Sequence, residues 1–215
     1  PGIRIEVLPS RKYIQHNTAS HLVGYLGRIN RKELTAHRDE NYKINDRIGK
    51  MGIEKLYEQY LRGEKGRRFF EVDVQGFEQR ELKLREPLPG SDIQLTVDIA
   101  MQKIAEKALE GEAGAVVAME VNTGRVLVLA SSPPMELTEF VGGISLKAWK
   151  SMQENPLKPF LNKAIQGQYP PGSTYKVITA LSRLAEQLLT PESTFFCPGS
   201  MVLPVQRYHC WRKGG

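Results

Sequence analysis

The sequence predicts an α+β protein in two parts, and three observations support this. Residues 1–90 hold 31 of the 54 charged side chains of the 215-residue chain. The segment 85–92, REPLPGSD, then supplies two prolines and a glycine, which favour a hinge. Beyond it, a hairpin pattern and an amphipathic helix pattern indicate antiparallel strands packed with helices. We therefore expect one part at residues 1–92 and a second at 93–215.

The first part predicts a small α+β module without chemistry of its own. IRIEVLP (3–9) alternates like a strand, and GIEKLYEQYLRG (52–63) predicts a helix that ends at Gly63. Segment 67–84 predicts two strands joined by a turn. The apolar face of the helix is made by Ile53, Leu56, Tyr57, Tyr60 and Leu61.

The histidines of this part carry no metal-ligand spacing. His16, His21 and His37 are too irregularly placed to suggest a shared ion. We expect all three to be structural.

The second part has a clearer order of elements. Segment 92–99 predicts a strand that leads into a helix at 100–111. GAVVAMEVNTGRVLVLAS (114–131) predicts a hairpin around an Asn-Thr-Gly turn. Its strands are almost continuously apolar, so we expect the hairpin to lie inside a larger sheet. A short helix is predicted at 144–152.

The strongest helix pattern begins where the chain reads QYPPGSTYKVITAL (168–181) and continues to residue 189. The prolines and the glycine suit the approach to a helix rather than its interior. Ser173 then falls at or just before the first turn, and Lys176 follows three residues later. Segment 190–211 is irregular, with one short hairpin.

Ser173 and Lys176 could form a nucleophile and its base. On a helical wheel of about 100° per residue they are about 60° apart, at the edge of an apolar stripe. A lysine at the edge of a buried face loses its proton more easily, and a neutral lysine can activate a serine hydroxyl. The stripe consists of Val177, Ala180, Leu181, Leu184 and Leu188.

A simpler interpretation is a helix cap. Ser-x-x-Lys is a short pattern, and serine is a preferred residue at helix starts. Both interpretations stay open on these residues alone.

Composition excludes other classes of function. The net charge of +6 is spread among acidic residues without an aromatic and basic stripe, so we expect no nucleic-acid partner. No apolar run approaches the roughly 20 residues of a membrane helix. The chain begins with Pro1, so we expect it to be a piece of a longer protein.

Two cysteines, Cys197 and Cys210, flank the predicted short hairpin. Their spacing fits one disulfide, two metal ligands or two separate thiols.

The segment NKAIQGQYPPGSTYK (162–176) resembles the first active-site motif of the penicillin-binding proteins. Further segments look like the class B monofunctional transpeptidases of that family, in matching order. The closing segment is most similar to the branch that acts in cell elongation. These segments are HLVGYLGRI, IGKMGIEKLYEQYLRGEKG, QLTVDIAMQKIAEKAL, GAVVAMEVNTGRVLVLAS, FVGGISLKAW and CPGSMVLP with RYHCWRKGG.

The resemblance implies a serine D,D-transpeptidase. Residues 1–92 would belong to a non-catalytic pedestal, and 93–215 to the first part of the transpeptidase domain. Ser173 would form an acyl-enzyme with the D-Ala-D-Ala stem of peptidoglycan, and with β-lactams, while Lys176 serves as base. No cofactor is needed for acyl transfer. A penicillin-recognising sensor or scaffold without turnover is the alternative.

The resemblance also implies partners, a location and a metal. A membrane glycosyltransferase and other elongation-complex proteins would be partners. A single N-terminal helix would anchor the protein in the inner membrane, with the catalytic part in the periplasm. Relatives can carry a zinc site near Cys197 and Cys210, which favours a structural zinc over the disulfide.

Two further motifs of the family, Ser-x-Asn and Lys-Thr/Ser-Gly, do not occur after Ser173 in these 215 residues. The second half of the oxyanion hole and the second lysine would therefore be missing. We expect a β-lactam acylation assay on this 215-residue polypeptide to give no stoichiometric labelling. Efficient labelling would contradict the expectation that the active site is incomplete.

Overall fold

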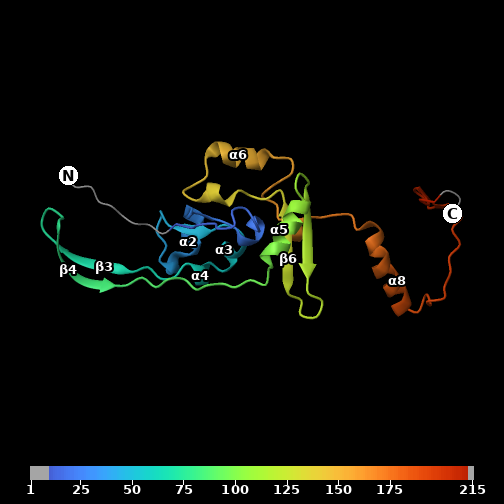
Figure 1. Cartoon of the computed structure of the whole chain (residues 1–215), viewed down its shortest axis with the longest axis horizontal. Coiled ribbons are helices and arrows are strands. Elements are labelled where there is room, and N and C mark those ends of the chain that lie inside the picture. Colours follow the sequence, from blue (N-terminus) through green and yellow to red (C-terminus); the bar gives the residue numbers. More distant parts are fainter. Residues whose placement is uncertain (1–9, 213–215) are drawn as a thin grey trace. The chain divides into compact units, whose positions relative to one another are not determined.

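The α+β fold is confirmed by the computed structural model, which describes residues 10–212 and consists of short antiparallel sheets and helices (Figure 1). The predicted strand at 3–9 lies outside the described residues. The chain forms two compact units that divide between Gln168 and Tyr169. This division between compact units is not at the domain boundary that we expect near residue 92. That domain boundary stays a prediction. We call these the first unit and the second unit and describe each by itself.

The first unit contains seven helices, two 3₁₀ turns and three antiparallel strand pairs among its described residues. The helices are α1 (Ser20–Val23), α2 (Arg31–Ala36), α3 (Gly52–Leu56), α4 (Glu58–Leu61), α5 (Ile99–Ala108), α6 (Leu146–Glu154) and α7 (Lys163–Gln166). The 3₁₀ turns are η1 (Arg38–Glu40) and η2 (Leu137–Phe140). The paired strands are β1 (Leu26–Arg28) with β2 (Arg47–Gly49), β3 (Arg67–Val72) with β4 (Glu78–Arg85), and β5 (Gly114–Met119) with β6 (Val126–Ser132).

The predicted helix at 52–63 is only partly correct, because the chain forms two short helices that break at Tyr57 (φ −111°, ψ 23°). Its predicted apolar face does not decide what is buried, since Leu56 is 73% exposed. The buried side chain is that of Glu54, which Arg11 pairs at 2.8 Å. Backbone packing also fixes this orientation, because a Cβ on Gly49 would lie 2.0 Å from the Glu54 carbonyl oxygen.

The hairpin predicted at 67–84 is confirmed as β3 and β4. Its strands are largely exposed, and the ion pair between Arg68 and Glu81 joins them across the ladder at 2.6 Å. The Asp73 carboxylate accepts the backbone N–H groups of Gln75 and Phe77 in the turn. These hydrogen bonds lower the pKa of Asp73.

The hairpin predicted at 114–131 is confirmed as β5 and β6, and α5 packs on β6 (Figure 1). The predicted strand at 92–99 is wrong, because α5 already begins at Ile99 and the residues before it form no ladder. The edge of β6 is instead occupied by a side chain. The fully buried Gln102 amide accepts from the Leu129 N–H at 2.9 Å and donates to the Leu129 carbonyl at 3.1 Å.

Among the described residues this sheet has only two strands, so its expected position inside a larger sheet stays a prediction. A small apolar cluster on β6 and α5 forms its core. The buried members are Ala105, Val128 and Ala130.

The short helix α1 joins the first half of this unit to the second through three buried or half-buried contacts. The Ala19 N–H donates to Glu106 Oε1 at 2.7 Å, on α5. The Ser20 hydroxyl accepts from the Met135 N–H at 2.9 Å. His21 Nε2 lies 2.6 Å from the Pro159 carbonyl oxygen, so its neutral ring donates there. Residues far apart in sequence are thereby held as one body.

The structural role expected for the histidines fits two of these sites. His21 is buried, and His37 pairs with Glu40 at 2.8 Å near the surface. Neither lies in a group of metal-binding side chains within the described part of the chain.

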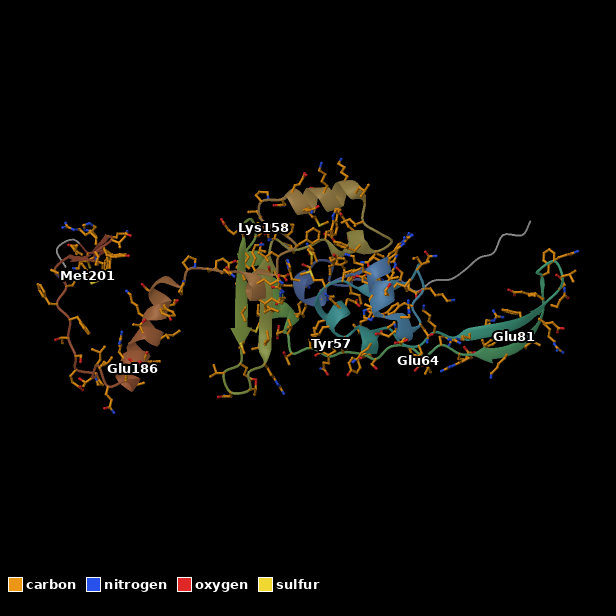
Figure 2. All side chains as sticks on the ribbon, turned by 180° about the vertical axis from the view of Figure 1, so that it is seen from behind. Tyr57, Glu64, Glu81, Lys158, Glu186 and Met201 are labelled. Carbon is orange, nitrogen blue, oxygen red and sulfur yellow. The ribbon has the colours of Figure 1, made fainter. Side chains whose placement is uncertain are left out.

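The second unit contains the 3₁₀ turn η3 (Gly172–Thr174), α8 (Tyr175–Ala185) and the strand pair β7 (Ser200–Val202) with β8 (Arg207–His209). The short hairpin is therefore confirmed, and so is the strongest predicted helix, although it ends at Ala185 rather than at residue 189. Glu186, labelled in Figure 2, follows α8 and lies 3.5 Å from Arg183.

The buried His21 predicts a pH dependence of stability. Burial, assisted by the charge of Lys163, lowers the pKa of His21 below its ordinary value of about 6.5. The unfolded chain then binds more protons than the folded one, so the free energy of unfolding should fall as pH drops below about 6.5. We expect a loss on the order of 1 kcal/mol between pH 7 and 5.5, measured by urea unfolding.

His21→Gln keeps a donor for the Pro159 carbonyl but does not titrate, so its stability should fall less over this range. His37→Gln, at the surface, serves as the matched control and should behave like the wild type. A His21→Gln variant that loses as much stability as the wild type would refute this assignment.

Candidate functional site

Ser173 lies in a tight turn that ends the Pro-Pro-Gly approach to α8. Pro171 adopts helical angles, and Gly172 follows with φ +55°, a conformation that glycine reaches without strain. The Thr174 N–H donates to the Pro171 carbonyl at 3.2 Å, which closes the turn. The sequence therefore places Ser173 in the middle of η3, two residues before Tyr175, the first residue of α8.

The serine does not cap the helix as one interpretation expected. Thr174 is the residue at the N-cap of α8, and its own hydroxyl bonds back to the Pro171 carbonyl at 2.5 Å. Over the part of the chain that the structure describes, no hydrogen bond engages the Ser173 hydroxyl or its backbone N–H. Neither group therefore has a partner within the described residues.

Lys176 lies in the first turn of α8, three residues after Ser173. In a 3₁₀ turn, residues three apart project from the same side, and in an α-helix they are neighbours. From this spacing we expect the two side chains to lie on one side of the chain at the junction of η3 and α8. The structure confirms the local elements on which this pairing was predicted.

The surroundings of the pair differ from the expectation. We expected the apolar stripe of α8 to be buried, but Leu181 is 60% exposed in the second unit, and Ser173 and Lys176 are exposed as well. The stripe is continuous with the site, because Val177 follows Lys176 directly. The predicted buried border of Lys176 is therefore not formed within this unit.

Cys197 and Cys210 are free thiols on either side of the β7–β8 hairpin, so the disulfide considered from the sequence is not formed here. The Cys210 N–H donates to the Gly199 carbonyl at 2.9 Å, which closes the hairpin. Searching the described residues finds no group of three or more His, Cys, Asp or Glu side chains that could hold a metal. Two thiols alone make an incomplete zinc site, so no chemical step is assigned to zinc.

One concave site was missed from the sequence. A cavity of about 450 Å³ opens in the first unit between β1, β2 and residues 140–149. Arg28 and Arg47 line it from opposite strands. No local motif could have indicated this pair, because it arises only from the register of β1 on β2.

Two domain families match the chain. The Penicillin-binding Protein dimerisation domain matches residues 1–95, and the Penicillin binding protein transpeptidase domain matches residues 114–215. Ser173 and Lys176 both lie within the second match.

The chain is similar along its whole length to curated relatives. It is 37% identical to the peptidoglycan D,D-transpeptidase MrdA of Acinetobacter baumannii, covering 100% of this chain and 32% of that protein. It is 38% identical to MrdA of Escherichia coli K12, covering 100% of this chain and 35% of that protein. The chain thus spans about a third of the length of these relatives.

A solved structure shares the fold. It is the penicillin-binding protein PBP2 of Helicobacter pylori, solved in complex with MreC. The superposition covers 96% of this chain and 38% of the PBP2 chain, with a TM-score of 0.84 and 32% sequence identity.

Proposed function

The chain belongs to the penicillin-binding proteins, as its sequence motifs predicted, and from that premise we propose that the protein is a peptidoglycan D,D-transpeptidase of the elongation branch, with Ser173 as its nucleophile. The observation that carries the proposal is the free Ser173 hydroxyl in a 3₁₀ turn, followed at three residues by Lys176 at the start of α8.

The proposed reaction begins with attack of Ser173 Oγ on the carbonyl carbon of the penultimate D-Ala of a stem peptide. Lys176 accepts the hydroxyl proton, which makes the otherwise weak nucleophile reactive. The tetrahedral intermediate collapses, the amide bond breaks, and the terminal D-Ala leaves as an amine that takes up a proton. An ester between Ser173 and the stem peptide remains.

A second stem peptide completes the cycle. Its amine attacks the ester carbonyl, the bond to Ser173 Oγ breaks, and a new amide forms the cross-link. The serine recovers its proton from the attacking amine through Lys176. A β-lactam would acylate the same oxygen by opening its ring, which leaves no amine to depart.

The backbone contributes to stabilising the charge that develops. The unbonded N–H of Ser173 can donate to the oxyanion of the tetrahedral intermediate. The following helix adds the positive end of its dipole and free N–H groups in its first turn. The turn thus supplies the nucleophile, its base and one oxyanion donor within four residues.

Partners and location follow from the same premise. We propose that the whole protein associates with a membrane glycosyltransferase and other elongation-complex proteins, and that it faces the periplasm from the inner membrane. Its relative from H. pylori is seen in complex with MreC. Over residues 10–212, no helix is both long and apolar enough to cross a membrane. A structural zinc at Cys197 and Cys210 stays a prediction.

Substitutions at the pair test the assignment in the full-length protein. Ser173→Ala should abolish labelling by a fluorescent penicillin, because the attacking oxygen is gone. Lys176→Met should slow labelling by about 10²–10⁴-fold, the usual worth of a positioned acid or base.

Ser182→Ala, an exposed serine on the same helix, is the matched control and should label at the wild-type rate. If Lys176→Met is labelled at the wild-type rate, Lys176 is not the base that accepts the Ser173 proton. A protein that labels but never cross-links stem peptides would instead be a sensor or scaffold.

A further inference from the structure

The cavity of the first unit brings together positive charges from both strands of its floor. Arg28 and Arg47 are direct partners in the β1–β2 register, so their side chains leave the same face of the ribbon. Both line the cavity of about 450 Å³. Arg28 is exposed and Arg47 is half-buried. Like charges directly opposite each other destabilise a strand pair, so the two arginines disfavour this register by an amount that solvent reduces.

The neighbouring charges do not neutralise the arginines. Lys50 and Glu33, which also line the cavity, pair with each other at 2.5 Å, and the Asn30 N–H donates to the same carboxylate at 2.8 Å. Across residues 10–212, no ion pair or side-chain hydrogen bond is formed by Arg28 or Arg47. Three cations against one carboxylate leave the lining with a charge of +2.

Aromatic side chains and glycines also line the cavity. Tyr25 and Phe140 stack there with ring centroids 4.0 Å apart, and Trp149 also lines the cavity. Gly142 and Gly143 both have positive φ, at 97° and 115°, and a Cβ on either would meet nothing within 4 Å. Two successive glycines therefore leave main-chain atoms open to the cavity, as where a ligand approaches a backbone closely.

We propose that this cavity is an anion-binding site, in which Arg28 and Arg47 hold a carboxylate or phosphate group and the Tyr25–Phe140 wall contacts the rest of the ligand. Guanidinium groups bind both anions through paired N–H donors. A bound anion would also cancel the repulsion between the two arginines. The lining residues belong to the first unit and Ser173 to the second, and the proposal does not depend on the transpeptidase assignment.

Thermal unfolding of the full-length protein tests this site with simple probes. Inorganic phosphate and sodium acetate are titrated separately, each against sodium chloride at matched ionic strength. At least one of the two anions should raise the Tm of the wild type on the order of 2–4 °C above the chloride series. The anion that acts distinguishes a phosphate ligand from a carboxylate ligand.

Arg28→Gln and Arg47→Gln should lose this gain, and without added anion each should melt at or above the wild-type temperature because the repulsion is relieved. Arg80→Gln, on the exposed β4 where Arg80 lies 3.6 Å from Glu71, is the matched control and should keep the gain. The proposal is overturned if neither anion acts beyond chloride, if the two variants respond like the wild type, or if they melt below it without anion.

Discussion

The buried contacts of residues 19–21 are the constraint on which the first unit depends. Three successive residues satisfy polar groups on Glu106, Met135 and Pro159, each more than 80 positions away in the chain. A buried polar group that loses its hydrogen-bond partner costs about 1–3 kcal/mol. Displacing α1 would therefore destabilise the first unit at three separate contacts. The pedestal-like first half and the start of the second half consequently fold as one body.

A buried polar side chain plays a similar role on α5. Gln102 occupies the edge of β6 with its amide, where a strand would otherwise pair, and it also donates to Glu106 at 2.8 Å. Glu106 in turn accepts the Ala19 N–H. One short network thus connects the start of α1 with α5 and β6, beside the small apolar cluster of the hairpin. Polar groups that are fully bonded make such a core specific.

Local chemistry explains what the sequence could predict. The Asn-Thr-Gly turn of β5–β6, the Pro-Pro-Gly start of α8 and the three-residue spacing of Ser173 and Lys176 depend on nearby residues alone, and all three have the expected local structure. The errors arose where distant residues decide. Glu54 is buried by Arg11, Gln102 displaces a strand, and Arg28 meets Arg47 only through register.

The central claim is that Ser173 is the nucleophile of a penicillin-binding transpeptidase. The most direct measurement is intact-mass analysis of the full-length protein after incubation with benzylpenicillin, followed by peptide mapping of the adduct. We predict one penicilloyl group per molecule, on the peptide that contains Ser173. An unmodified protein, or an adduct carried by any other residue, would contradict the account.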